Sequence, residues 1–378
     1  MSDQLLPPGA RLVHIGPHKT GSTAIQVAMK EVRDQLPQHG AWMPSGPYRR
    51  RAAGWGLGLA GKPAGLERPS ADLWDELVTE VDSAGDLRAC ISNEDFGRAT
   101  PEQVARIVED LGGDRVHVVA VARRLDRYLP SQWQERVKAS ETRTFDAWLR
   151  VVLHGDESSW DHRNVWGAHD VEALVERWLN VVPPERFTLI VSDDSDHDFI
   201  PRSFEQLLGL PSGLLRPVSD RSNRSLNVVE AELLRQINAV VVPLGLRGPR
   251  YRKLVRDGVT NALLDAPGSV PGARVPLPEW ALDEIRELSD RRADAVASLG
   301  VQVLGDPDRL RVPADVLPGD PDAARASVPL DAVTSAVGAT LCKMIESIDE
   351  SASPAPPAKP EPTSVRQALA ERVRRRRD

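Results

Sequence analysis

The feature that most constrains the fold is a short apolar run that leads through a glycine-containing turn into a helix-like segment. Arg11 to Ile15 is the apolar run, and helical spacing begins at Thr23. The turn from Gly16 to Thr23 carries glycine, lysine and hydroxyl side chains. A strand, loop and helix in this order direct free backbone N–H groups and the positive end of the helix dipole at one point. The segment therefore predicts a loop that cradles a phosphate group.

The order of residues in this loop differs from the common nucleotide-binding pattern. A Walker A loop has the form G-x-x-x-x-G-K-[ST], whereas Lys19 stands two residues before Gly21 and Ser22 takes the Walker lysine position. Lys19 supplies a point charge, and the hydroxyls of Thr20, Ser22 and Thr23 add hydrogen-bond donors. Gly21 permits close approach of the backbone to a ligand. We expect a phosphate-binding loop, but not a Walker A loop.

Strand-like and helix-like segments alternate along the first two thirds of the chain. The predicted strands are Arg11 to Ile15, Ala41 to Met43, Leu87 to Ser92, Val116 to Ala122 and Phe187 to Val191, the last clear one. The predicted helices are Thr23 to Val32, Ser70 to Asp82, Pro101 to Leu111, Asp126 to Lys138, Phe145 to Val152, Val171 to Leu179, Phe199 to Leu207 and Val228 to Val241. This alternation predicts an α/β, P-loop-like three-layer fold, with a central parallel sheet of about five strands and helices on both faces. Ligands of such sheets bind at the carboxyl ends of the strands.

Composition divides the chain into three parts. Residues 1–310 are expected to form the α/β domain, within which the Arg- and Gly-rich stretch Tyr48 to Gly65 predicts a long loop. Residues 311–350 form an appendage with an amphipathic helix from Leu330 to Ser347. That helix either packs on the domain or pairs with a second copy as a homodimer. Residues 351–378 form a Pro-rich linker and a basic tail, which we expect to be disordered.

Charge and composition exclude several classes of protein. A formal net charge of −7 over 378 residues argues against a general nucleic-acid binder, although a local basic pocket remains compatible with a small polyanion. No run of about 18 apolar residues and no signal-like N-terminus occur, so we expect a cytoplasmic protein without a transmembrane segment. Cys90 and Cys342 stand far apart in apolar stretches, which predicts two buried side chains rather than a disulfide or a metal site.

The phosphate loop extends into a longer motif. The string from His14 to Thr23 is H-I-G-P-H-K-T-G-S-T, and Gln26 follows it. It resembles the PAPS-dependent sulfotransferases, in particular bacterial members with the form H-I-G-x-H-K-T-G-[ST]-T-x-x-Q, and the resemblance covers roughly residues 10 to 240. It implies that the loop binds the 5′-phosphosulfate of PAPS (3′-phosphoadenosine 5′-phosphosulfate) and that Lys19 stabilises the bridging oxygen as sulfate departs. The loop residues that it places at the donor are His18, Lys19, Thr20, Gly21, Ser22 and Thr23.

A second part of the resemblance concerns the 3′-phosphate of the donor. The family binds this group with an arginine at the end of a strand and a serine eight residues later, and Arg123 and Ser131 have that spacing. An arginine with a nearby hydroxyl supplies charge-assisted hydrogen bonds to phosphate. The family often has proline two residues after the arginine, where Leu125 stands here, which leaves the local turn open.

A third segment, before the predicted helix at Val228, resembles a late part of the bacterial family that closes over the nucleotide. The resemblance places Arg224 and Ser225 at the donor. The alternative is an ordinary capping loop in which Ser225 or Asn227 caps the helix.

Sulfuryl transfer requires a residue near the donor that takes the acceptor proton. Glu94, which follows the predicted strand that ends at Ser92, is the candidate base, and related sulfotransferases use glutamate or histidine in this role. Asp95 and His18 are the alternatives. The sulfuryl group carries less charge than a phosphoryl group, so no metal is expected. His14, inside the first strand, is expected to be a buried structural residue.

The acceptor class stays open among small molecules, carbohydrates and lipids. Trp42, Trp55, Trp160 and Trp166 lie on or near predicted loops, where they either stack on an acceptor or anchor the loops to the core.

Two other functions remain open beside sulfuryl transfer. One is a P-loop nucleotide or small-molecule kinase, for which Asp193 and Asp194 are the candidate magnesium ligands. The other is a non-catalytic nucleotide or polyanion binder. Binding of PAP (3′,5′-adenosine bisphosphate) without metal, compared with ATP and Mg²⁺, distinguishes the two ligand classes.

Overall fold

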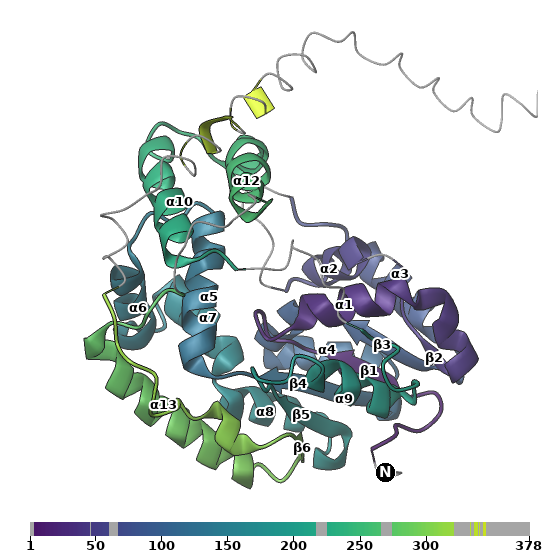
Figure 1. The fold of residues 1–378 in the computed structure, drawn as a ribbon. Helices are drawn as coiled ribbons and strands as arrows, with labels where there is room; N and C mark the ends of the chain where they lie inside the picture. Colours follow the sequence, from purple (N-terminus) through teal and green to yellow (C-terminus); the bar gives the residue numbers. More distant parts are fainter. Residues whose placement is uncertain are drawn as a thin grey trace, which may run out of the picture.

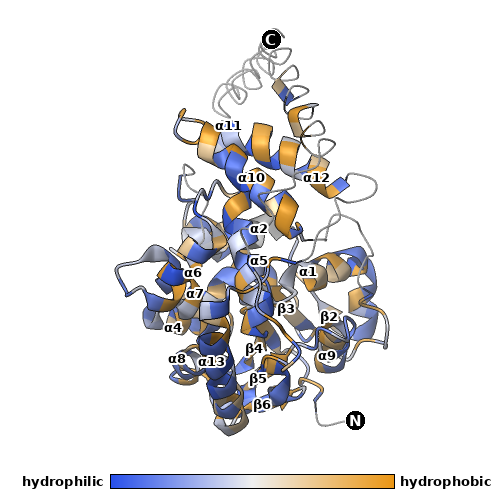
Figure 2. Ribbon diagram, turned by 60° about the vertical axis from the view of Figure 1, so that its left-hand side comes forward, coloured by the Kyte–Doolittle hydropathy of each residue, from blue (hydrophilic) through white to orange (hydrophobic). Residues whose placement is uncertain are grey.

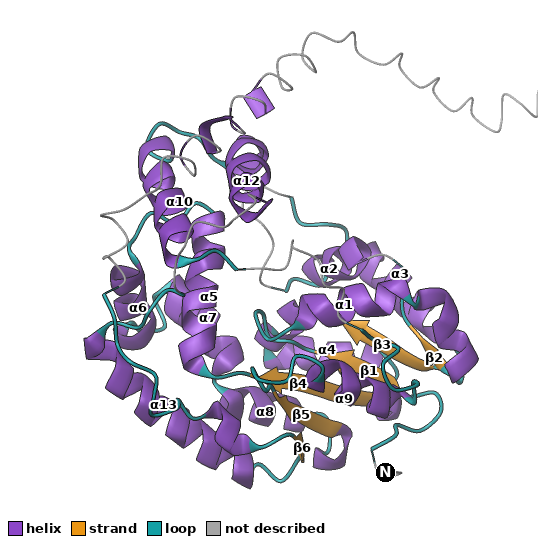
Figure 3. Cartoon of the chain, in the orientation of Figure 1, coloured by secondary structure: helices purple, strands orange, loops and turns teal. Residues whose placement is uncertain are grey.

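The molecule is built around a sheet of six parallel strands in the order β2-β3-β1-β4-β5-β6 (Figure 3). This computed structural model describes residues 4–45, 47–59, 67–216, 225–265 and 274–320, and the helical positions 333, 336–338, 340 and 343–344. The strands are β1 (Arg11–His14), β2 (Ala41–Trp42), β3 (Arg88–Ser92), β4 (Val116–Ala122), β5 (Phe187–Val191) and β6 (Gln302–Leu304). The predicted α/β fold with a parallel sheet is confirmed.

The sheet has one strand, β6, beyond β5, which the sequence prediction of about five strands gave as the last clear one. β6 is three residues long, lies at the edge of the sheet and pairs only with β5 among the described strands. Only Leu304 of its three residues is buried. An edge strand of this kind carries no apolar run, so its sequence lacks the signal by which the other strands were predicted.

Helices cover both faces of the sheet. They are α1 (Ser22–Glu31), α2 (Pro47–Gly56), α3 (Asp72–Asp82), α4 (Pro101–Asp110), α5 (Leu125–Lys138), α6 (Phe145–His154), α7 (Trp160–His169), α8 (Val171–Leu179), α9 (Phe199–Leu208), α10 (Val228–Val241), α11 (Gly248–Tyr251), α12 (Asn261–Asp265) and α13 (Glu279–Ser298). A π-helix spans Arg252–Thr260, and 3-10 helices span Arg33–His39, Glu94–Arg98, Gly113–Arg115, Pro184–Arg186 and Pro307–Leu310.

The central strand β4 shows how the two faces form. Successive side chains of a strand point to opposite faces, and Val118 and Ala120 belong to one core cluster whereas Val119 and Val121 belong to another. The first cluster takes in α3, α4, α8 and the end of α13, and the second takes in α1 and α9. The sheet is therefore the middle of three layers, as predicted.

A third core cluster, the helical core, lies outside the sheet, among helices. α5, α6, α7, α10, the π-helix, α12 and the first half of α13 bury apolar side chains against one another. α10 and α12 stand together at one end of the molecule (Figure 1), and α13 turns a largely hydrophilic side toward the viewer in Figure 2. No helix in the described part of the chain is long and apolar enough to cross a membrane.

The described positions between 333 and 344 are helical, within the helix predicted from Leu330 to Ser347. Val333 and Ala336 contact the helical core. Val337 and Met344, which belong to the predicted apolar face, are 53% and 47% exposed. Val333 also belongs to the predicted apolar face, so the contact with the helical core uses part of that face together with Ala336. Cys342 and residues 351–378 lie outside the described residues, whereas Cys90 is buried, as predicted.

The stretch Tyr48 to Gly65, predicted as a long loop, contains the helix α2 (Pro47–Gly56). Its glycines suggested a loop, but close packing explains two of them. A Cβ atom on Gly54 would lie 2.6 Å from the side-chain amide of Asn93, and one on Gly56 would lie 2.5 Å from a backbone carbonyl. The loop prediction is therefore wrong for this part, and the last residues of the stretch lie outside the described chain.

The four tryptophans expected on or near loops lie in regular elements. Trp42 belongs to β2, Trp55 to α2, and Trp160 and Trp166 to α7, a helix that the sequence prediction missed. Trp55 is 5% exposed, whereas Trp160 is 50% exposed and lies under the Arg136 guanidinium. Trp55 therefore packs in the protein interior, whereas Trp160 lies at the surface.

We predict that Trp178→Ala lowers the free energy of unfolding by about 3–5 kcal/mol, because this fully buried α8 side chain leaves a cavity under the sheet. Trp160→Ala is the matched control. Removal of this half-exposed side chain should lower the free energy of unfolding by less than about 1 kcal/mol. Urea unfolding measures both. Similar losses for the two variants would contradict the packing described for α8.

Candidate active site

The strand order brings four chain segments to one edge of the sheet. β1 lies between β3 and β4, and β5 follows β4. Because all the strands are parallel, their carboxyl ends meet at this edge. The loop after β1 therefore has Glu94 and Asp95, which follow β3, on one side, and Arg123, which follows β4, on the other. Asp194, which follows β5, lies beyond Arg123.

The loop after β1 has three residues with positive φ: Gly16 (79°), Lys19 (66°) and Gly21 (102°). The Val121 N–H donates to the Gly16 carbonyl at 2.7 Å, which extends the pairing between β1 and β4 into the loop. The Arg123 guanidinium donates to the Lys19 carbonyl at 3.0 Å. These two bonds hold Lys19 in a left-handed conformation that non-glycine residues rarely adopt.

Two of the loop hydroxyls are used inside the loop. Thr20 and Ser22 are buried and donate to the Pro17 carbonyl, at 2.7 and 3.3 Å. These donors are therefore not directed outward, contrary to the expectation from the sequence. Gly21 and Thr23 are exposed, and Gly21 is the N-cap of α1 without a side-chain cap. The first N–H groups of α1 thus have no side-chain acceptor at the cap.

The Lys19 ammonium is held by a carboxylate of α5. Nζ donates to Glu135 Oε1 at 3.1 Å, and Lys138 Nζ donates to the same oxygen at 3.0 Å. Burial raises the pKa of Glu135, but the two lysines outweigh it and lower the pKa to about 2. Sequence reasoning missed both partners, although Glu135 and Lys138 lie on the same helix face as Ser131, four and seven residues away.

The Arg123 guanidinium also pairs with a carboxylate. It donates to Asp194 Oδ1 at 2.8 Å, and Arg127 Nε lies 3.8 Å from the other Asp194 oxygen. Asp193 pairs with Arg309 at 3.4 Å. The two aspartates considered as magnesium ligands are thus engaged with arginines. Within the described ranges, no three His, Cys, Asp or Glu side chains are placed to hold a metal ion.

Ser131 lies half-buried on α5, and Ser225 is exposed on the segment that precedes α10. The Leu226 carbonyl, one residue after Ser225, accepts a hydrogen bond from the Gln134 side chain of α5 at 2.8 Å. This segment is therefore anchored to α5 next to Glu135. Asn227, and not Ser225, is the N-cap of α10, within a capping box. Arg224 lies outside the described residues.

Glu94 begins a 3-10 helix on the other side of the loop and is 6% exposed. Gln26 Nε2 donates to Glu94 Oε2 at 3.0 Å. The second oxygen, Oε1, lies 3.8 Å from Arg51 and 3.9 Å from the His18 ring. Burial raises the pKa of the Glu94 carboxyl, but His18, Arg51 and the hydrogen bonds from the backbone and Gln26 together lower it, so the net shift is downward. Glu94 is therefore an ionised carboxylate at neutral pH.

Asp95 is fully buried, and both its oxygens accept hydrogen bonds. The Trp55 indole donates to Oδ2 at 3.0 Å, and His18 Nε2 lies 2.8 Å from Oδ1. Burial raises the pKa of Asp95, but the hydrogen bond and charge of His18 and the guanidiniums of Arg51 and Arg98 lower it. Burial and Arg98 in turn lower the pKa of His18. Asp95 thus fixes the His18 ring beside Lys19.

His14 is fully buried, which confirms its predicted structural role. Its Nδ1 lies 2.8 Å from Ser92 Oγ, and burial lowers its pKa to about 4. Ser92 Oγ also accepts from Gln26 Nε2 at 3.0 Å. Gln26 therefore connects β3 and Glu94 to α1, and orients the carboxylate.

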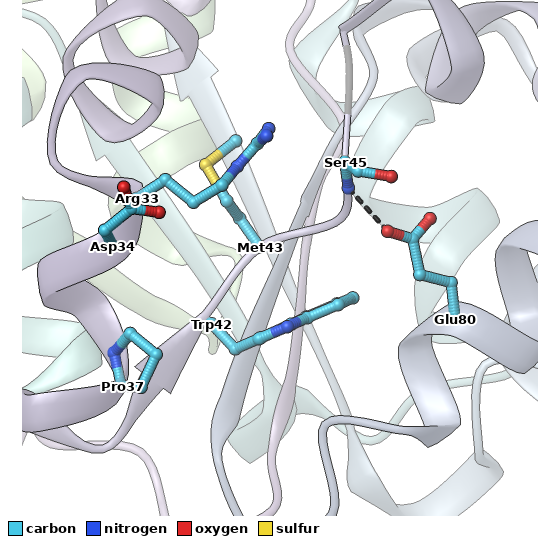
Figure 4. A pocket seen from close by; sticks show the side chains of 7 residues that line it. All are labelled: Arg33, Asp34, Pro37, Trp42, Met43, Ser45 and Glu80. Carbon is cyan, nitrogen blue, oxygen red and sulfur yellow. Dashed lines mark hydrogen bonds between the residues drawn. The ribbon is translucent and has the colours of Figure 1, made fainter.

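A pocket lies at the outer edge of the sheet, where Trp42 is one of the lining side chains (Figure 4). The other lining residues are Arg33, Asp34, Pro37, Met43, Ser45 and Glu80. Trp42 belongs to β2, and β3 separates that strand from β1 and its loop. The pocket is thus distinct from the site at the loop.

Comparisons with known proteins give one likeness. No protein-family model matches the chain, and no curated protein matches it significantly. A solved structure described as a sulfotransferase from Alicyclobacillus acidocaldarius is similar, with 16% identity over 63% of this chain and 96% of that chain. Its TM-score is 0.35. A likeness of this strength carries no argument about chemistry, which rests on the residues of this chain.

We predict that Gly16→Ala destabilises the protein and displaces Glu94. Alanine at φ 79° is strained, and its Cβ would lie 2.8 Å from the Glu94 Cβ. Gly85→Ala is the matched control, because its φ of 57° is also positive but nothing lies within 4 Å.

The control should lose about 1 kcal/mol for its backbone conformation alone, and Gly16→Ala about 3 kcal/mol because overpacking adds to the strain. Urea unfolding measures both values. Equal losses would show that Glu94 does not lie against the loop.

Proposed function

We propose that this protein is a PAPS-dependent sulfotransferase that moves a sulfuryl group to a hydroxyl or amine of a small-molecule, carbohydrate or lipid acceptor. One observation carries the proposal. The Lys19 loop lies between a carboxylate and an arginine, with Glu94 against Gly16 and Arg123 hydrogen-bonded to the Lys19 carbonyl. The motif resemblance of the loop supports the choice of donor.

The residues present fit a nucleotide with phosphates on both sides of the sugar. The uncapped N-terminus of α1 and the Lys19 ammonium suit the 5′-phosphosulfate. Arg123 and Ser131 suit the 3′-phosphate, since a guanidinium and a hydroxyl both donate to phosphate oxygens. The direct bond between Arg123 and Lys19 keeps the two anion positions close. Ser225 is a further candidate, on a segment anchored to α5.

The transfer step assigns one role to each side of the loop. The acceptor oxygen or nitrogen attacks sulfur in line, the bond from sulfur to the bridging oxygen breaks, and the acceptor proton passes to Glu94. Lys19 stabilises the negative charge that develops on the bridging oxygen. Atoms and charges balance, with PAP and the sulfated acceptor as products.

Among the three candidate bases, the contacts favour Glu94. One oxygen of Asp95 accepts a hydrogen bond from the Trp55 indole at 3.0 Å, and the other lies 2.8 Å from His18 Nε2, which it holds. Glu94 Oε1 has side-chain contacts only at 3.8 Å or more among the ion pairs described. That oxygen is the one best able to receive a proton.

The kinase alternative has less support. Ser22 stands at the Walker lysine position and donates to Pro17, and Asp193 and Asp194 face arginines. The non-catalytic binder has no specific observation in its favour, because Glu94, the candidate base, lies against the loop that carries Lys19.

The discriminating experiment measures thermal stabilisation by PAP without metal and by ATP with Mg²⁺. A ligand at one hundred times its Kd stabilises the folded state by about 2.7 kcal/mol, so a clear rise in Tm is expected with PAP. Stabilisation by Mg-ATP alone would replace the proposal with the kinase. Stabilisation by PAP without transfer to any acceptor would favour the binder.

We predict that Lys19→Ala lowers the rate of sulfuryl transfer by roughly 10²–10³-fold, because a preorganised charge at the leaving oxygen is lost. Lys30→Ala is the matched control, since Lys30 is an exposed lysine in the last turn of α1, the helix that follows the Lys19 loop. Release of PAP in single-turnover reactions measures both. A small loss for Lys19→Ala would refute the mechanism.

We predict that Glu94→Gln lowers the transfer rate by about 10²–10⁴-fold with PAP affinity unchanged. Because the pKa of Glu94 is lowered from 4.5, the base stays ionised from pH 5 upward, and the wild-type rate should fall only as the pH drops below 4.5. Asp95→Asn and His18→Asn serve as comparisons. Near-normal turnover by Glu94→Gln would exclude it as the base.

A further inference from the structure

Both cations that we propose as phosphate ligands are paired with carboxylates in this structure. Lys19 Nζ lies 3.1 Å from Glu135 Oε1, and Arg123 donates to Asp194 Oδ1 at 2.8 Å. The two carboxylates come from separate elements, α5 and the segment after β5. A carboxylate and a phosphate present the same kind of acceptor oxygen to a cation. Each carboxylate therefore occupies a position that an oxyanion of the donor would otherwise fill.

Each of these carboxylates has a second cation within reach. Lys138 donates to Glu135 at 3.0 Å, and Arg127 Nε lies 3.8 Å from Asp194 Oδ2. If a phosphate takes the first cation, the second remains as a counter-charge. The exchange thus leaves a cation beside each carboxylate. An uncompensated charge at a partly buried site would be costly.

The two pairs are accessible enough to exchange. The side chains of Lys19 and Glu135 are 28% and 32% exposed, and those of Arg123 and Asp194 are 27% and 25% exposed. Ion pairs with this degree of exposure are weak. A phosphate carries more charge and more acceptor oxygens than a carboxylate, so it wins the competition for lysine or arginine.

We infer that Glu135 and Asp194 are positioning residues that hold Lys19 and Arg123 as internal substitutes for the donor's phosphate groups and release them when the donor binds. This inference rests on the proposed function, which supplies the donor. It adds that α5 presents Ser131, Glu135 and Lys138 toward the loop as one functional face. Donor affinity is then set by a competition between carboxylate and phosphate.

The competition predicts that removing either negative charge tightens donor binding. Glu135→Gln and Asp194→Asn should each lower the Kd for PAP by about fivefold, the order expected for a partly exposed ion pair. The matched control is Glu284→Gln, which removes the same charge from another partly exposed pair, with His154 at 2.9 Å. It should leave the Kd unchanged.

Two measurements test the inference. Calorimetric titration with PAP at fixed ionic strength gives the Kd of the wild type and the three variants. Mass spectrometry after brief treatment with an acetylating reagent gives the reactivity of Lys19, which an ion pair suppresses. We expect Lys19 labelling to rise severalfold in Glu135→Gln, and to stay at the wild-type level in Asp194→Asn and Glu284→Gln.

The outcomes separate this inference from the proposed function. Unchanged or weaker PAP binding by Glu135→Gln and Asp194→Asn would overturn the inference and leave the donor intact. Failure of the wild type and all variants to bind PAP would overturn the proposed function instead. In that case Lys19 labelling still tests whether Glu135 holds the lysine. Equal labelling in the wild type and in Glu135→Gln would overturn that part of the inference.

Discussion

The parallel pairing of β1 between β3 and β4 is the constraint on which the rest of the structure depends. Arg11–His14 pairs with Ala89–Ser92 on one side and with Val116–Val119 on the other. The loop after β1 is therefore enclosed by the segments that follow both neighbours, and hydrogen bonds from β4 extend into it. Without this strand order, the acidic side chains after β3 and the arginine after β4 would not flank the same loop. The site is a consequence of topology first and of side-chain contacts second.

Charge at the site is organised by local pairing and not by the charge of the whole chain. The protein carries a net charge of −7, yet cations gather at the loop because each is matched by a carboxylate. On the β3 side two acids lie beside two arginines: Arg51 lowers the pKa of Glu94 and of Asp95, and Arg98 lowers that of Asp95. On the β4 side the cations dominate, with Glu135 and Asp194 as partners. The loop thus has the proposed base on one side and an excess of cations on the other, as the proposed reaction with its anionic leaving group requires.

The helical core gives α5 its orientation. α5 packs into that core through an apolar stripe, which consists of Leu125, Tyr128, Leu129, Trp133 and Val137. Ser131, Glu135 and Lys138 lie away from this stripe, and Glu135 contacts the loop. Packing far from the sheet therefore decides which face of α5 meets Lys19. The Gln134 side chain on the same helix holds the segment before α10 by its backbone.

The sequence by itself determined the elements whose signals are local. Propensity, spacing and turn chemistry within a few residues predicted the strand, loop and helix around Lys19, the alternation that implies a parallel sheet, and the buried His14. Only the tertiary structure decided the partners. Glu135 lies 116 residues from Lys19 and Asp194 lies 71 residues from Arg123, and β6 and α2 owe their form to neighbours elsewhere in the chain. Such contacts depend on strand order and helix packing, which no local pattern encodes.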